Sequence, residues 1–195
     1  MTDRSVTVND RSVTLGFMAM PHATADALLD AGVAVAERHG LAGLSVNRVV
    51  AEAGVAKGTF YVHFADRDAF VDALHARFHD AVDAAVGTAI AGVPPGAEQL
   101  LAGVNAYLDV CLRDRTVKAL ALEARSDPAL SAAMASRHDR FAAIAAPSFK
   151  AMGWPDASAS AQLLSAMVSE IAVRELDAGR RLPAQRRALR RYLGG

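Results

Sequence analysis

Cysteine, aromatic residues and long hydrophobic runs are all scarce in this chain of 195 residues. The single cysteine, Cys111, excludes an intrachain disulfide and fits a reducing compartment. No run of about 18 apolar residues occurs, so we expect no membrane span. The N-terminus lacks a basic segment followed by an apolar one, so we expect a cytoplasmic rather than a secreted protein.

Catalytic and cofactor motifs are also missing from the sequence. It contains no G-x-S-x-G, no H-E-x-x-H, no P-loop and no dinucleotide-binding fingerprint. We therefore expect no enzyme activity and no cofactor. The formal net charge is zero, but residues 180–195 carry six arginines and no acid, whereas residues 1–66 carry five basic and seven acidic side chains.

What the chain has in quantity is alanine and helical periodicity. It is 52% hydrophobic and only 6% aromatic, and alanine, the best helix former, supplies much of the apolar content. Ser45 and Asp66 can cap helices, Gly40 and Gly54 can end them, and Pro147 should kink one. The sequence predicts an all-α fold of about nine helices, at 24–39, 46–53, 56–63, 67–91, 97–112, 116–125, 128–152, 156–178 and 184–193.

The stretch GVAKGTFYVHFADR, residues 54–67, is unusually polar and flexible for a core helix. The helices at 46–53 and 56–63, joined at Gly54, match a helix-turn-helix. Phe60 and Phe64 lie one turn apart and should face the core. Gly58 costs the helix roughly 1 kcal/mol, which suggests close approach to another surface. The side chains around it supply donors of the kinds that bond phosphate oxygens.

The whole segment LSVNRVVAEAGVAKGTFYVHFADRDAF, residues 44–70, resembles the DNA-binding segment of the tetracycline-repressor (TetR) family. With the helix at 24–39, the resemblance covers about residues 24–75. It implies a helix-turn-helix DNA-binding domain at 21–66 and a helical effector-binding and dimerisation domain at 67–195. Residues 1–20 read as a flexible tail, or the true start is Met18 or Met20. A further alternative is an arm whose Arg4 and Arg11 enter a DNA minor groove.

The resemblance also implies a set of DNA contacts. Residues expected at the phosphate backbone are Ser45, Thr59, Tyr61, His63 and Arg67. Those expected nearest base edges in the major groove are Asn47, Lys57 and Gly58. The sequence departs from the family pattern at Arg67, where lysine is usual, at Leu41, where an aromatic is common, and at Asp26 and Asp30, which add negative charge to the first helix.

Implied partners are a double-stranded, near-palindromic DNA operator, a second copy of the chain and a small hydrophobic effector that releases a repressor from DNA. Candidate effector-binding residues are Tyr107, Cys111, Met134, Phe141, Ile144, Phe149 and Trp154, each of which could instead be plain core. The expected dimer face comprises Leu163, Leu164, Met167, Ile171 and Leu189, and the six late arginines should form a solvated rim. The alternative function is a small-molecule-binding protein with a vestigial DNA-binding domain.

Two sharper possibilities concern metal and redox chemistry. His75 and His79 have the i, i+4 spacing of metal ligands, with Asp72, Asp83 or His138 as a third. We favour a solvated histidine pair and predict no metal site. Cys111 could sense redox state, but a lone cysteine in an apolar helix is usually an inert core residue.

Overall fold

The computed structural model describes residues 21–115 and 128–194, with side chains described for residues 24–115 and 139–194. In these ranges the chain forms eight α-helices and no strand, which confirms the all-α prediction. The helices are α1 (Pro21–His39), α2 (Val46–Ala53), α3 (Lys57–His63), α4 (Arg67–Ile90), α5 (Ala97–Arg113), α7 (Pro128–Ala151), α8 (Ala157–Ala178) and α9 (Pro183–Tyr192). The predicted helix at 116–125 and the first twenty residues, with Arg4 and Arg11, lie outside the described residues.

The predicted capping residues begin and end the helices around the turn. Ser45 Oγ accepts a hydrogen bond from the backbone N–H of Arg48, and Asp66 accepts one from Ala69 N at 2.8 Å. Gly54 adopts φ of 68°, a left-handed conformation that glycine reaches without strain. Local sequence chemistry therefore sets the boundaries of α2 and α4. Farther along, α7 continues through Pro147 to Ala151, and a kink there stays a prediction.

Two hydrophobic clusters divide the described residues. The first is formed by α1, α2, α3 and the start of α4, and its aromatic centre is Phe60, Phe64 and Phe70, whose ring centroids lie 4.9–5.5 Å apart. The second begins at Phe78 and includes buried residues of α4, α5, α7, α8 and α9. The helix-turn-helix therefore has its own small core, separate from the core of the C-terminal body.

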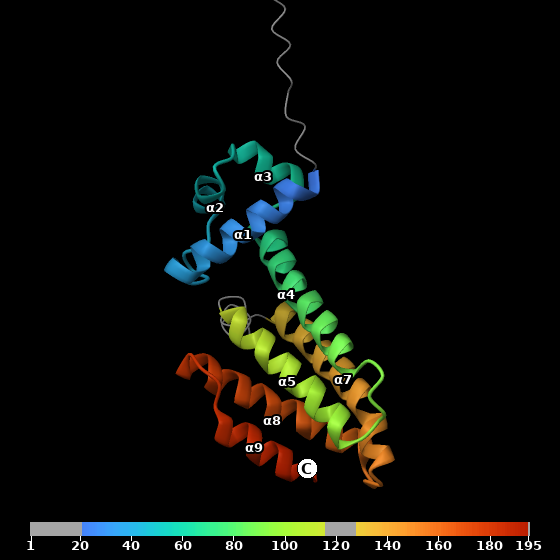
Figure 1. The fold of residues 1–195 in the computed structure, drawn as a ribbon. Helices are drawn as coiled ribbons and strands as arrows, with labels where there is room; N and C mark the ends of the chain where they lie inside the picture. The colour runs from blue at the N-terminus through green and yellow to red at the C-terminus, as the bar shows by residue number, and fades with distance from the viewer. Residues whose placement is uncertain (1–20, 116–127, 195) are drawn as a thin grey trace, which may run out of the picture.

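The long helix α4 joins these two units. It leaves the α1–α3 unit and runs along the C-terminal body, as Figure 1 shows. Leu74 belongs to the first cluster, and Phe78, one turn later, belongs to the second. Helix α1 packs closely on α4, because a Cβ atom at Gly32 would lie 2.5 Å from Phe70 Cζ. A movement of α4 would thus reach the first unit through direct packing.

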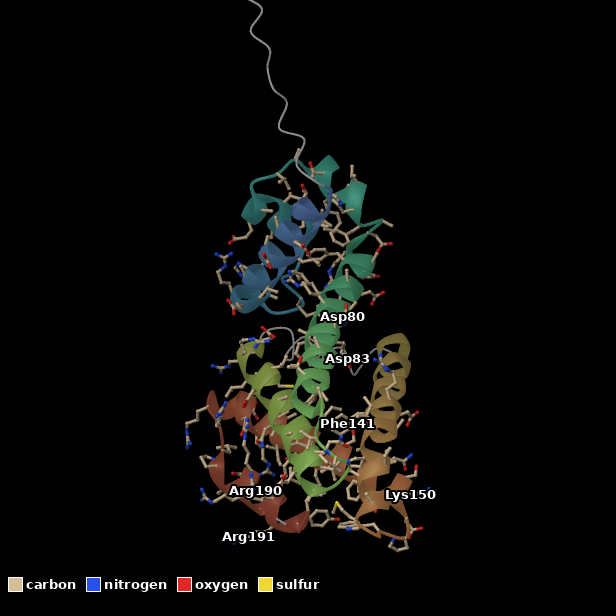
Figure 2. All side chains as sticks on the ribbon, turned by 45° about the vertical axis from the view of Figure 1, so that its right-hand side comes forward. Asp80, Asp83, Phe141, Lys150, Arg190 and Arg191 are labelled. Atoms are coloured by element: carbon tan, nitrogen blue, oxygen red, sulfur yellow. The ribbon has the colours of Figure 1, made fainter. Side chains whose placement is uncertain are left out.

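The C-terminal arginines do not form a uniformly solvated rim, so that prediction was wrong in part. Arg186 is mostly buried and pairs with Glu175 of α8, which is only 1% exposed. Arg181 pairs with Asp109 of α5 at 2.7 Å. Arg190 and Arg191 are exposed and lie at the end of the molecule opposite α1–α3 (Figure 2). The late arginines thus divide between packing α9 and facing solvent.

The residues predicted for the dimer face also divide into two groups. Leu164 is fully buried within its own chain, so its assignment to a partner contact was wrong. Ile171 and Leu189 are mostly buried but line a groove at the surface of α8 and α9, so their assignment stays a prediction. Leu163 is 61% exposed, and Met167 is half-buried.

In the described part of the chain, no helix has the length and apolar content needed to cross a membrane.

Candidate nucleic-acid interface and ligand cavity

The outward face of α3 is built from four consecutive exposed positions of the helical wheel. Phe60 is fully buried and anchors the helix, so residues on the opposite side face solvent. Lys57 and Gly58 are exposed, Tyr61 is 49% exposed and Val62 is 78% exposed. Thr59 and His63 are half-buried and flank this face. Helix α3 thus presents one cation, one phenol and one aliphatic side chain around a glycine.

Val62 was not among the predicted contact residues. It is an exposed valine on a helix whose other large apolar residue, Phe60, is buried. A valine methyl group can contact a thymine methyl in the major groove. The wheel position of Val62, between those of Gly58 and the half-buried Thr59, was the signal that could have found it.

Gly58 has no role in the fold that requires glycine. Its φ is not positive, and a Cβ atom built there would meet nothing within 4 Å. Glycine lowers the stability of a helix interior by roughly 1 kcal/mol relative to alanine. The chain therefore carries a destabilising residue at the centre of its most exposed helical face without a local structural reason.

Ser45 and Asn47 lie at the start of α2. Ser45 is half-buried, and its oxygen accepts the capping hydrogen bond, which leaves the hydroxyl proton available to donate. Asn47 is exposed in the first turn of α2. Both residues precede the turn that positions α3, so they belong to the same helix-turn-helix.

Arg67 ties the first turn of α4 to the loop between α1 and α2. Its Nε donates to the carbonyl oxygen of Leu44 at 2.7 Å, and its Nη2 donates to that of Leu41 at 2.9 Å. Arg48 holds the same loop through the carbonyl oxygen of Gly43 at 2.8 Å. Most of the Arg67 guanidinium is thus engaged in fixing the loop that leads into α2. A contact of Arg67 with phosphate stays a prediction.

Electrostatics around the helix-turn-helix favour an anion at α3. The acidic Asp30 is paired with Arg77 of α4 at 2.7 Å, and Glu52 of α2 is paired with Arg38. Helix α3 contains no acid, and Lys57 forms no ion pair within the described residues. Of the two aspartates that add negative charge to α1, Asp30 is therefore paired with a cation, whereas Lys57 keeps its charge exposed.

A cavity of about 240 Å³ lies in the C-terminal body. Its lining comes from α4, α5, α7 and α8. The lining residues are His79, Val82, Asp83, Val86, Gly87, Ile90, Tyr107, Arg140, Phe141, Ile144, Ser165, Val168 and Ser169. Figure 2 labels two of them, Asp83 on α4 and Phe141 on α7. The same helix that packs on α1 therefore forms much of one cavity wall.

The predicted effector residues fall into three groups. Tyr107, Phe141 and Ile144 line the cavity. Cys111 and Phe149 are buried in the core, and Trp154 packs edge-on against Phe149, so these three lie outside its lining. Met134 has no described side chain.

Sequence reasoning missed the lining residues of α4 and α8. On α8 a signal was present, because Ser165 and Ser169 interrupt an apolar helix at i, i+4 spacing, and Ser165 is buried. On α4 the polar lining residues His79 and Asp83 have the same i, i+4 spacing, but we read them as candidate metal ligands, and the valines of the lining follow an ordinary core pattern.

The histidines of α4 are not a solvated pair, so that interpretation was wrong. His75 is buried and His79 is half-buried, with His79 at the cavity wall. Among residues with described side chains, no group of three or more His, Cys, Asp or Glu could hold a metal ion. The side chain of His138 lies outside that set. Cys111 is buried in the second cluster.

Residues 28–74 match the model of the family described as bacterial regulatory proteins, tetR family. The match covers α2, α3 and most of α1, and it ends where α4 leaves the first hydrophobic cluster. No curated protein matches the chain.

Solved structures resemble the chain over most of its length. A TetR-like transcriptional regulator from Rhodococcus sp. RHA1 aligns with a TM-score of 0.74 and 21% identity, over 86% of this chain and 92% of that one. Another transcriptional regulator from the same organism gives 0.76 and 24%, over 87% and 94%. The multidrug binding protein EbrR, solved with imidazole, gives 0.67 and 25%, over 86% and 88%. The first two similarities establish the fold.

Proposed function

Since residues 28–74 are a TetR-family domain and the whole chain has the fold of TetR-like regulators, we propose that the protein is a DNA-binding transcriptional regulator. In this proposal the protein is a repressor that a small hydrophobic effector releases from a near-palindromic operator. It acts in the cytoplasm and has no catalytic activity. The alternative is a ligand-binding protein with a vestigial DNA-binding domain, which would bind no DNA fragment more tightly than random DNA.

The observation that carries DNA binding is Gly58 in the exposed face of α3. A glycine that the fold does not need, next to a half-exposed tyrosine and near a lysine without an ion pair among the described residues, suits a helix that lies against another surface. Lys57 can bond guanine and Asn47 can bond adenine in the major groove. Ser45, Thr59, Tyr61, His63 and Arg67 remain our candidates for phosphate contacts.

The cavity supports release by an effector through α4. Helix α4 lines the cavity between His79 and Ile90, and its first residue, Arg67, holds the loop before α2. An effector that favours a displaced α4 would therefore move the helix-turn-helix. DNA and effector then oppose each other by one coupling free energy, which is the same from either side.

Two copies are needed to place recognition helices in successive major grooves about 34 Å apart. We propose that the α8–α9 face forms the homodimer. A shallow groove of about 620 Å³ on this face is lined partly by Met167, Ile171 and Tyr192, and Leu163 lies exposed on α8. This face keeps four of the five residues named from sequence and leaves out the fully buried Leu164.

The proposed function is tested by titrating the purified protein against the intergenic DNA that flanks its own gene, across salt and with nonspecific competitor. We expect saturable, competitor-resistant binding whose logarithm falls linearly with the logarithm of salt concentration. Testing fragments from elsewhere in the genome covers a distant operator. Binding no tighter than to random DNA in every fragment would favour the vestigial alternative.

Gly58→Ala is expected to separate stability from DNA binding. The added methyl group meets open space and improves helix propensity, so the free energy of unfolding should be unchanged or rise by up to about 1 kcal/mol. On DNA the same methyl occupies the surface of close approach, and affinity should fall by about tenfold or more. Thermal unfolding and DNA titration measure the two effects.

The matched control is Gly87→Ala, because Gly87 is a helical glycine of α4 whose Cβ also meets nothing within 4 Å. It should stabilise the chain similarly and leave DNA affinity in the absence of effector unchanged. Unaltered DNA affinity in Gly58→Ala would show that α3 does not lie closely against DNA at this residue.

Lys57→Ala is expected to change sequence preference, whereas Tyr61→Phe and Arg67→Ala should weaken binding evenly. Lysine can read a base edge, and that contact is worth roughly 1–3 kcal/mol of discrimination. In this proposal Tyr61 and Arg67 bond phosphates, which carry no sequence information, and Arg67→Ala also removes the hydrogen bonds that hold the loop before α2. The measurement is affinity for the operator and for its single-base variants. Equal losses on every sequence for all three proteins would contradict the assignment.

A further inference from the structure

The cavity of the C-terminal body limits the size, polarity and charge of what it can hold. We propose that its ligand is an uncharged, mostly apolar molecule of about ten non-hydrogen atoms with one hydrogen-bonding group. This inference rests on the proposed function only for the role of the cavity as the effector site. The size, polarity and charge of the ligand follow from the cavity walls.

Size follows from the volume. An apolar cavity of about 150 Å³ holds one benzene molecule, with six carbon atoms. In proportion, about 240 Å³ holds about ten non-hydrogen atoms, the size of a substituted single ring or a short acyl chain. A large polycyclic drug or a long-chain fatty acid exceeds this space.

Polarity follows from the depth of the walls. The inner wall is formed by Val82, Val86 and Val168, which are all buried, together with the aromatic ring of Phe141. The buried Ser165 brings a hydroxyl to the same wall. An apolar ligand therefore gains most by placing its body against this wall. One donor or acceptor on the ligand can bond the Ser165 hydroxyl, and this hydrogen bond replaces the hydration that the group loses.

Charge follows from the ion pair at the solvent-exposed rim. Arg140 of α7 donates through Nη2 to Oδ2 of Asp83 on α4. Apart from His79 and Tyr107, these are the two ionisable side chains among the lining residues that the structure describes, and they pair with each other. An anion would need Arg140 and would face Asp83, and a cation would need Asp83 and would face Arg140. The exposed pair carries no net charge, so a charged ligand would lose hydration in the cavity without a net electrostatic attraction, whereas an uncharged ligand would not.

A matched series on one carbon skeleton tests the charge assignment. Phenylpropanol, phenylpropylamine and phenylpropionate share a ring and a three-carbon chain, and differ mainly in the charge of the end group at neutral pH. We expect calorimetry on the full chain to show phenylpropanol binding at least about tenfold tighter than both charged analogues. A charged analogue that binds as tightly as the alcohol, or no binding by any of the three, would overturn the proposal.

Two substitutions place the binding in this cavity. Ser165→Leu fills the inner wall and should reduce phenylpropanol affinity by about tenfold or more. Gln162→Leu lies on an exposed position of the same helix, outside the lining, and should leave affinity unchanged. If Ser165→Leu does not fold, Ile144→Ala at the exposed rim serves instead, with a smaller loss. Equal affinity in the wall and control variants would place the ligand elsewhere.

The ligand measurements use no DNA, so their outcome does not depend on whether the protein binds an operator. Binding of phenylpropanol with no operator binding anywhere would keep the ligand class and favour a sequestering protein. Operator binding without phenylpropanol binding would keep the regulator and remove the ligand class.

Discussion

Arg186→Met is expected to lower the free energy of unfolding by about 3–5 kcal/mol, because it leaves a buried carboxylate without its partner. Glu175 is almost fully buried in α8, and Arg186 donates to both of its oxygens, at 2.8 and 2.6 Å. Arg186 also donates to Asp109 of α5 at 2.9 Å. One guanidinium thus joins α9 to two other helices. Chemical denaturation of the variant and the parent measures the loss.

Two further proteins make the result specific. Arg187→Met removes the neighbouring arginine, which is exposed and has no ion pair among the described residues, and should change stability by less than about 0.5 kcal/mol. The double variant Glu175→Gln with Arg186→Met removes the buried charge as well and should recover much of the loss. A loss below about 1 kcal/mol in Arg186→Met alone would show that the pair does not hold α9.

Lowering the pH should narrow the difference in the free energy of unfolding between Arg186→Met and the parent. Burial by itself raises the pKa of Glu175, but hydrogen bonds from Arg186 and from the Leu182 backbone, with the nearby arginine charges, lower it below 4.5. A lowered pKa in the folded state means that this stabilisation is complete at neutral pH and is lost as pH falls through the folded value. In the variant the unpaired carboxylate accepts a proton more readily. Denaturation at neutral pH and below pH 4.5 compares the two proteins.

The helices and the turn were predictable because their signals are local. Ser45, Gly54 and Asp66 act on residues within one helical turn, and the α2 boundaries match the prediction at both ends. The outward face of α3 was predictable in the same way, since burial of Phe60 orients its neighbours. Local signals of this kind survive folding because tertiary contacts reinforce them here.

What the sequence could not show depends on partners far away in the chain. Arg67 resembles a phosphate donor in sequence, but it bonds carbonyl oxygens 23 and 26 residues earlier. Arg186 lies in a basic run typical of solvent, yet it meets an acid on α8. The wall that α4 contributes to the cavity has the same explanation, because Val82 and Val86 follow the spacing of ordinary core. Neither a hydrogen bond to a distant backbone carbonyl nor the packing of two helices can be read from the order of residues in the sequence.

Phe60→Ala is expected to unfold the helix-turn-helix while the C-terminal body stays folded. Phe60 is fully buried and touches both Phe64 and Phe70 in the first cluster, and such a truncation costs about 3–5 kcal/mol. A unit of about fifty residues has a total stability of roughly 2.5–7.5 kcal/mol. The truncation therefore removes from about two fifths to all of this stability. The measurement is DNA affinity together with backbone hydrogen exchange along the chain.

Phe149→Ala is the matched control, because Phe149 is equally buried but belongs to the second cluster. In Phe60→Ala, amides of α1–α3 should lose protection while those of α5 and α8 keep it, and DNA binding should disappear. In Phe149→Ala the loss of protection should begin in the C-terminal body. The two clusters meet along α4, between Leu74 and Phe78, and at Val33 of α1, which packs against both, so few contacts carry destabilisation from one to the other. If Phe60→Ala instead unfolds the whole chain in one transition, the two units are a single cooperative domain, and α4 transmits stability as well as movement.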